Sequence, residues 1–278
     1  MRIRIVDAFS DRPFGGNPAG VLLLDGGFPP DEWLQQVAAE VNLSETAFAH
    51  PLPAGGDADW ALRWFTPAAE VDMCGHATLA TAHVLNQHSL ATTGRPAGPV
   101  RFTARCGILT AEAAEDGGIT MDFPTSSLTP WEPPAEIARA LGGVEILTAH
   151  DTAEHIGDLL IELADEKTVR ELRPDFAGLR AFARRGVIVT APAEDPARGY
   201  DFVSRGFFPL VGIDEDPVTG SAHTALAPFW AARLGRTELT GLQGGARTGL
   251  VKVTLAGDRT LLTGRAVTVI DGELLTAP

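Results

Sequence analysis

The sequence has few cysteines and few basic residues. Its 278 residues include two cysteines, Cys74 and Cys106, which excludes a disulfide framework and favours a reducing compartment. Lysine and arginine number 22 against 36 acidic residues, and the formal net charge is −14. Phosphate backbones and anionic lipid surfaces repel so acidic a chain, so we expect neither nucleic acid nor a membrane as a partner.

Long apolar runs are also missing. No run approaches the roughly 20 residues of a membrane helix. Arg4 and Asp7 interrupt the start of the chain, where a signal peptide would carry its apolar core. We therefore expect a cytoplasmic protein.

Two stretches of the same form stand out in the chain. Residues 65–77 and 212–223 each run from acidic residues through a glycine into an alanine-rich apolar segment. Ser221 occupies a position typical of a helix N-cap, which predicts a helix over Ala222 to Leu234. Helix N-termini present unpaired N–H groups that bind anions. We predict that the two stretches face each other across one active site.

Hydrophobic periodicity and turn residues predict the remaining elements. We predict a helix over Glu32–Glu40, capped by Asp31, and a linker between the two halves over Pro124–Pro134. The predicted strands are Arg2–Ala8, Val21–Leu24, Thr46–Ala49, Trp60–Phe65, Val100–Thr103, Gly107–Ala113, Ile119–Phe123, His155–Leu163, Gly186–Thr190, Tyr200–Phe207, Gly249–Leu255 and Leu261–Ile270, and the other predicted helices are His76–Gln87, Glu136–Leu141, Glu166–Glu171 and Pro174–Phe182.

The two halves of the chain match coarsely. Aligning residues 74–77 with residues 219–222 brings both apolar helices and the strand pairs after them into register. Such internal repetition suggests duplication into two similar α+β halves. We predict an N-terminal half over residues 1–123 and a C-terminal half over 124–278, with residues from about 265 to 278 free to pack back onto the first half.

Seven short segments, in order along the chain, resemble the PhzF-like family (phenazine biosynthesis PhzF and its relatives), part of the diaminopimelate-epimerase-like superfamily. Each segment alone is a weak signal, and together they are specific. The segments are Asp7–Phe9, Phe14–Val21, Leu43–Phe48, Arg63–Pro67, Cys74–Thr78, Leu172–Phe176 and Asp214–His223.

The resemblance implies two pseudo-symmetric domains, each a mostly antiparallel sheet wrapped around a central helix, with the active site in the cleft between them. It also implies a homodimeric isomerase that needs no cofactor. In the phenazine enzyme a glutamate moves a proton between two carbons of a dihydro-hydroxyanthranilate, and that glutamate matches Glu45. The other residues that match the family site are His76, Asp216, Gly220 and Ser221, with Ser44 and Gly75 beside them.

Moving a proton on carbon needs a base that can return the proton as an acid. Glu45 suits this role if its apolar neighbours raise its pKa toward neutrality; otherwise it is an ordinary glutamate at a strand end. His76, at a helix start, is either a neutral proton donor or acceptor, or a structural histidine. Asp216 is either a turn residue or a group that holds a substrate amine or hydroxyl or orients His76. Gly75, Gly220 and Ser221 could present N–H and hydroxyl groups to a substrate carboxylate.

Cys74 raises an alternative mechanism. Racemases of the superfamily use one cysteine from each half, and Cys74 matches the first, but Thr219 stands at the second position. A threonine is far too weak an acid to replace a thiol, so a two-thiol racemase is disfavoured. A metal site is also disfavoured, because His76 and His83 lie seven residues apart without the further ligands of a known spacing.

The sequence thus predicts an isomerase that moves a proton in a small carboxylate-bearing substrate, with Glu45, His76 and Asp216 as catalytic residues. Ser44, Gly75, Gly220 and Ser221 are the predicted substrate-binding residues. Neither a cofactor nor a metal is expected. The alternatives are a small-molecule binding protein that has lost turnover, an epimerase or racemase, and a dehydratase. The substrate and its pathway stay open.

Overall fold

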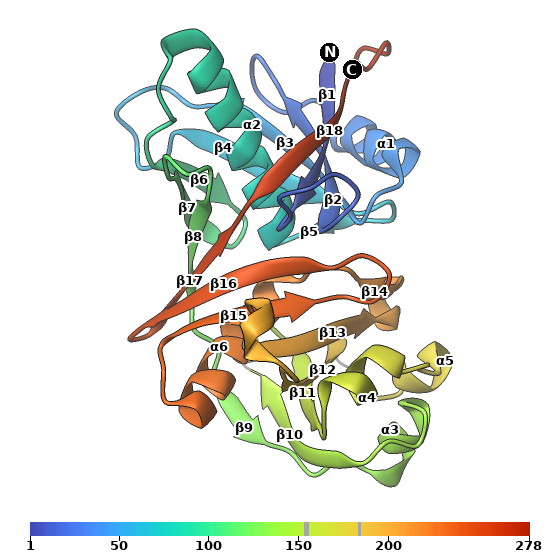
Figure 1. Ribbon diagram of the computed structural model, residues 1–278. Helices are drawn as coiled ribbons and strands as arrows, with labels where there is room; N and C mark the ends of the chain where they lie inside the picture. The colour runs from blue at the N-terminus through green and yellow to red at the C-terminus, as the bar shows by residue number, and fades with distance from the viewer. Residues whose placement is uncertain (153–155, 183–184) are drawn as a thin grey trace. The chain divides into compact units, whose positions relative to one another are not determined.

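The computed structural model describes residues 1–152, 156–182 and 185–278 (Figure 1). Contacts between Cα atoms divide the chain into two compact units, residues 1–122 with 263–278 (unit 1) and residues 123–262 (unit 2). The boundary thus lies one residue before the predicted one, and the return to unit 1 begins two residues earlier than predicted. The chain passes between the units within strands β8 (Ile119–Pro124) and β17 (Arg259–Gly264). Among the described residues, no helix is long and apolar enough to span a membrane.

Unit 1 is a mostly antiparallel sheet. Its strands lie in the order β18–β1–β2–β3–β4–β6–β7–β8, with the short β5 beside β4. Two neighbouring pairs, β2 with β3 and β4 with β6, are parallel, and a helix lies between the two strands of each pair in the chain. The strands are β1 (Arg2–Ala8), β2 (Asn17–Leu23), β3 (Glu45–Pro51), β4 (Trp60–Phe65), β5 (Glu70–Val71), β6 (Val100–Ala104), β7 (Gly107–Ala113), β8 and β18 (Ala266–Glu273).

The central helix of unit 1 is α2 (Gly75–Thr93). Its first turns carry no formally charged residue and are buried continuously from Gly75 to Ala82, as expected of a helix enclosed by a sheet. Gly94, in the left-handed conformation, ends it. The outer helix α1 (Asp31–Val41) has Pro30 as its N-cap, so the prediction that Asp31 caps it was wrong. Asp31 instead accepts a hydrogen bond from Arg63.

Unit 2 repeats the plan of a sheet with one long central helix, α6 (Gly220–Leu234). Its strands pair in the order β9–β10–β11–β12–β13–β15–β16, and β14 pairs with β13. The strands are β9 (Leu128–Pro130), β10 (Ile146–Thr152), β11 (Asp158–Leu163), β12 (Gly186–Pro192), β13 (Phe202–Phe208), β14 (Ile213–Asp216), β15 (Glu238–Gln243) and β16 (Gly249–Ala256).

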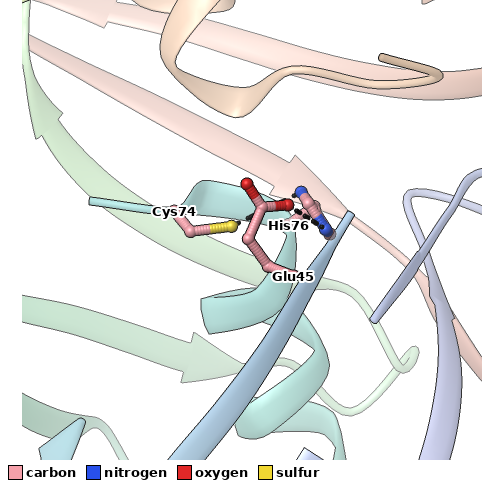
Figure 2. A group of neighbouring side chains, drawn as sticks. All are labelled: Glu45, Cys74 and His76. Carbon is pink, nitrogen blue, oxygen red and sulfur yellow. Dashed lines mark hydrogen bonds and ion pairs between the residues drawn. The ribbon is translucent and has the colours of Figure 1, made fainter. Parts of the chain in front are cut away.

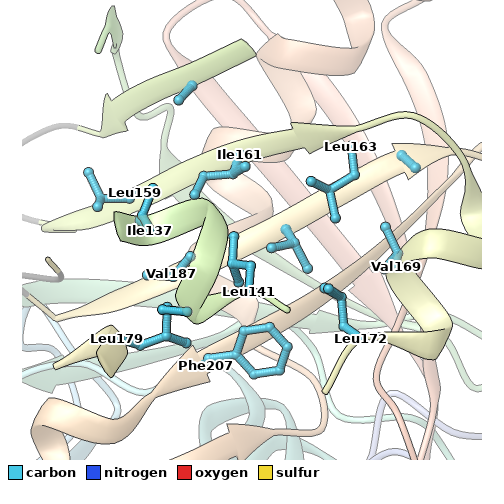
Figure 3. Packing of buried hydrophobic residues seen from close by; sticks show 14 of the residues in the cluster. Ile137, Leu141, Leu159, Ile161, Leu163, Val169, Leu172, Leu179, Val187 and Phe207 are labelled. Atoms are coloured by element: carbon cyan, nitrogen blue, oxygen red, sulfur yellow. The ribbon is translucent and has the colours of Figure 1, made fainter. Parts of the chain in front are cut away.

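A large apolar core in unit 2 lies beneath three short helices, α3 (Ala135–Ala140), α4 (Glu166–Glu171) and α5 (Phe176–Leu179) (Figure 3). Ile161, Val187 and Phe207, each from a different strand, are fully buried in it. At roughly 2 kcal/mol for each large side chain removed from water, this core supplies much of the stability of the unit.

Several sequence-based predictions need correction here. Pro124–Pro134 is not a free linker, because β9 lies within it and pairs with β10. Strands β5, β10, β14 and β15 were missed, and the strand predicted over Leu261–Ile270 is two strands, β17 and β18. The helix predicted through Phe182 ends at Leu179. Of the strand predicted from His155, β11 begins at Asp158, and His155 lies outside the described residues.

Candidate active site

Glu45 is the first residue of β3, at the strand edge where the sequence places it. Helix α1 ends at Val41, and its C-cap residue Asn42, in the left-handed conformation, turns the chain back toward the sheet. Strand β3 then runs parallel to β2, with Glu45 opposite Ala19. The Glu45 side chain is 13% exposed, so its carboxylate lies at the margin of the buried interior. Ser44 precedes it and is half-buried.

Asn17 is brought to this site by a tight loop between β1 and β2. Gly16 has a φ of +58°, and a Cβ atom there would lie 2.0 Å from the Ala8 carbonyl oxygen, so only glycine fits. The Asp7 carboxylate accepts a hydrogen bond from the Phe14 amide at 2.6 Å and ties the loop down. Asn17 then begins β2 and is fully buried.

His76 and Cys74 stand at the start of the central helix of unit 1. Cys74 is the extended N-cap residue of α2, and His76 is the second helical residue. The Thr78 hydroxyl donates to the Cys74 carbonyl at 2.6 Å, which fixes the first turn. Both side chains are buried, at 6% exposure for Cys74 and 3% for His76.

The side chains of Glu45, Cys74 and His76 point toward one another (Figure 2). His76 Nε2 lies 3.3 Å from Glu45 Oε2, and His76 Nδ1 lies 3.5 Å from the Cys74 sulfur. Asn17 Nδ2 lies 3.1 Å from the same Nδ1 atom. Both ring nitrogens of His76 are thus in contact with side chains from other parts of unit 1.

The protonation of His76 follows from these contacts. Burial lowers the pKa of His76 to about 3, so the ring is neutral at physiological pH. An amide nitrogen can only donate, so His76 Nδ1 accepts the hydrogen bond from Asn17. The ring proton then resides on Nε2, which faces the Glu45 carboxylate. The arrangement therefore places a neutral N–H group 3.3 Å from Glu45 Oε2, in contact but without the alignment of a hydrogen bond.

Asp216, in unit 2, belongs to a hydrogen-bond network around the start of α6. Thr219 is the N-cap residue, and its hydroxyl donates to Asp216 Oδ2 at 2.6 Å. Gln243 Nε2 donates to that hydroxyl at 2.9 Å, while Gln243 Oε1 accepts from the Thr219 amide at 2.9 Å. Cys74 and Thr219, which the alignment of the two halves makes equivalent, are both N-cap residues.

Ser221 is the second residue of α6 and not its N-cap, which corrects the prediction from sequence. The helix begins two residues earlier than expected, because the chain leaves β14 and turns at Pro217 directly into Thr219. Ser221 Oγ accepts a hydrogen bond from Arg185 Nη2 at 2.9 Å. The same guanidinium pairs with the fully buried Asp158. Gly220 is buried at the first helical position.

The acidic residues before α6 have different roles, although residues 213–216 form one short strand. Asp214 is exposed and Asp216 is buried. Glu215 forms a two-pronged ion pair with Arg205, whose other nitrogen donates to two backbone carbonyls of the α4 segment. Through Arg205, Glu215 therefore links β14 to β13 and to the α4 segment.

The structure brings Glu45, Gly75 and His76 together in unit 1, and Asp216, Gly220 and Ser221 lie around the start of α6 in unit 2. Sequence reasoning assigned no role to Asn17, although it lies in one of the segments that carry the family resemblance. Gln243 and Arg185 were also missed. Neither residue lies in a recognisable motif. Gln243 is the last residue of β15, a strand that was not predicted.

Comparisons with known proteins agree with this architecture. The model of the phenazine biosynthesis-like protein family matches residues 6–272. An uncharacterized isomerase of Pseudomonas aeruginosa is 48% identical over 270 residues, covering 97% of this chain and 96% of that protein. An uncharacterized isomerase of Halalkalibacterium halodurans is 43% identical over 274 residues, covering 98% of each chain.

Solved structures show the same relationship. A PhzF family protein from Enterococcus faecalis has a TM-score of 0.86 at 38% identity, covering 99% of each chain. A hydroxyproline epimerase from Agrobacterium vitis, at 16% identity, covers 98% of this chain and 91% of that one with a TM-score of 0.61, a likeness of fold alone. The predicted family, fold class and enzyme class are confirmed. The chain therefore belongs to the phenazine biosynthesis-like (PhzF) family and is an isomerase of that family.

Proposed function

We propose that this isomerase moves a proton between carbon atoms of a small carboxylate-bearing substrate, with Glu45 as the general acid/base. The observation that carries the proposal is the contact between Glu45 and the neutral His76, 3.3 Å apart. A carboxylate at the margin of a buried interior, with a fixed N–H group beside it, can take a proton from carbon and return it.

His76 and Asn17 support Glu45 in this proposal. A neutral imidazole with its proton on Nε2 can donate to Glu45 or to a substrate oxygen that gains negative charge, without adding a cation to the site. The Asn17 amide fixes which nitrogen carries that proton. Asn17 is thus a positioning residue for His76.

Gly220 and Ser221, together with Ser44 and Gly75, are the proposed substrate-binding residues, and Asp216, which the sequence analysis lists as catalytic, is proposed to act by holding the substrate. Asp216 would accept from an amine or hydroxyl of the substrate, and the glycine amides and the Ser221 hydroxyl would bind its carboxylate.

Thr219 bears on the alternative of a two-thiol racemase. Its hydroxyl proton is already donated to Asp216, which makes it a still poorer substitute for a second thiol. One-base chemistry through Glu45 needs neither a second thiol nor a cofactor. The homodimer that the family resemblance implies stays a prediction.

Solvent deuterium exchange tests the proposal. Small amino and hydroxy acids are first screened by thermal shift, because a ligand at 100 times its Kd adds about 2.7 kcal/mol of stability. Each binder is then incubated with enzyme in deuterium oxide and followed by proton NMR. We expect the wild type to exchange a carbon-bound proton, and Glu45→Gln to lose about 10²- to 10⁴-fold in rate while still binding. Glu112→Gln, an exposed strand glutamate of the same unit, is the matched control.

The outcomes separate the alternatives. Exchange at the wild-type rate in Glu45→Gln would refute the mechanism. Tight binding without exchange in the wild type would favour the small-molecule binding protein. Retention of configuration at the exchanged carbon would argue against an epimerase, and loss of water from the substrate would indicate a dehydratase.

A further inference from the structure

Three side chains at the start of α2 offer metal-binding atoms of the kinds that zinc prefers. One donor atom each from Glu45, Cys74 and His76 lies within 4.8 Å of the other two. Thiolate sulfur, imidazole nitrogen and carboxylate oxygen are the three kinds of protein ligand that bind zinc. The sequence gives no hint of this set, because Glu45 lies on a different element, some thirty positions before Cys74 and His76.

The distance between the sulfur and imidazole donors already fits a tetrahedral zinc ion. A zinc ion at about 2.3 Å from sulfur and about 2.05 Å from nitrogen separates those two atoms by about 3.6 Å at a tetrahedral angle. Cys74 Sγ and His76 Nδ1 are 3.5 Å apart. The carboxylate of Glu45 must move nearer, since tetrahedral ligands are about 3.4 Å apart, and its three side-chain torsions permit this. A water molecule would complete the shell.

The charges also balance. A thiolate and a carboxylate neutralise a divalent ion, so the occupied site carries no net charge, as a buried site requires. Ligation transfers the thiol proton to the buffer. Asn17 would have to turn its amide away from His76 Nδ1, which lowers the affinity.

We propose that Glu45, Cys74 and His76 form a site for a thiophilic divalent cation such as Zn²⁺. Occupation is reversible and is not needed for turnover, because it engages the carboxylate that acts as the acid/base. The ion is therefore an inhibitor of the proposed reaction. Binding itself does not depend on the proposed function, since it rests on the donor atoms alone.

Cobalt is the probe for this site, because tetrahedral thiolate-bound Co²⁺ absorbs in the near ultraviolet and visible. The full-length protein is freed of metals with a chelator, titrated with Co²⁺ and then with Zn²⁺. We expect one equivalent of Co²⁺ to give a thiolate charge-transfer band, and Zn²⁺ to abolish it. Cys106→Ser should keep the band, because Cys106 is exposed and outside the set, whereas Cys74→Ser should lose it.

A third variant distinguishes the loss of a metal ligand from a folding defect. His76→Gln keeps both thiols and should weaken Co²⁺ binding at least tenfold while circular dichroism stays that of the wild type. A band that persists in Cys74→Ser, that disappears in Cys106→Ser, or that is missing from the folded wild type would overturn the proposal. The cobalt spectrum needs no substrate, so failure of the metal site and failure of the proton-transfer chemistry are told apart.

Discussion

His223 offers a sharp test of the structure around the start of α6. The side chain is fully buried, and its Nδ1 atom donates to the Thr219 carbonyl at 2.9 Å. Among the described residues, no hydrogen-bond partner meets its Nε2 atom. Burial lowers the pKa of His223 to about 4, and the Thr219 carbonyl offsets only part of this effect. The ring is therefore neutral in the folded protein and cannot take a second proton without losing stability.

The size of the effect follows from linkage. In the unfolded chain His223 has a pKa of about 6.5, so above that pH the ring is neutral in both states and contributes nothing. As the pH falls from about 6.5 toward about 4, the unfolded state binds the proton first and the folded state loses stability. Lowering the pH from about 7.5 to about 5 should cost roughly 2 kcal/mol through this one residue.

His223→Asn isolates the contribution. The asparagine amide can still donate to the Thr219 carbonyl, but it does not titrate. The free energy of unfolding is measured by urea denaturation of both proteins across this pH range, and the difference between them is plotted against pH. We expect the variant to be less stable near neutrality because of the lost packing, and the gap to narrow by roughly 2 kcal/mol at about pH 5. Parallel profiles would refute a buried neutral His223.

Three further outcomes are expected. Gly16→Ala should lower the unfolding free energy by more than about 2 kcal/mol in urea, because the added Cβ atom meets the Ala8 oxygen at 2.0 Å; an unchanged value would mean that the loop adapts. Asn17→Leu should slow deuterium exchange about tenfold at unchanged substrate affinity, since the variant loses control of the His76 tautomer, and a wild-type rate would remove Asn17 from the mechanism. Phe207→Ala should cost about 3 to 5 kcal/mol by urea denaturation; a loss below 1 kcal/mol would contradict its place in the core.

Much of the fold is visible in the sequence because strong local patterns coincide with the final elements. Strands β1 and β4 begin and end at the predicted residues, since β1 alternates between polar and apolar residues and β4 is a mostly apolar run that ends before Thr66 and Pro67. The two central helices are predictable because an alanine-rich apolar run that is buried on every side needs no polar face. Strand β14 was missed because its polar sequence Ile-Asp-Glu-Asp is held by pairing with β13 and by the Arg205 ion pair, which are tertiary effects.

The candidate site, too, was predictable only in part. Glu45 and His76 could be proposed from the resemblance, and in the structure their side chains are in contact. Helix N-caps were predicted poorly, because a serine near the start of a helix can instead make a hydrogen bond to a residue distant in the sequence. Ser221 does so, as the acceptor for Arg185. The cap predicted at Asp31 failed for the same reason, since its carboxylate pairs with Arg63.

The return of the chain to unit 1 has a consequence for synthesis. Strand β1 pairs with β18, so Arg2 lies opposite Glu273, almost the full length of the chain away. During translation β1 leaves the ribosome first. One of its edges stays unpaired until β18 is made, which happens only after the whole of unit 2 has been synthesised. Such remote pairing slows folding and leaves an open edge to aggregation. Unit 2, by contrast, is one contiguous segment, so its sheet and central helix can assemble before the first unit is closed.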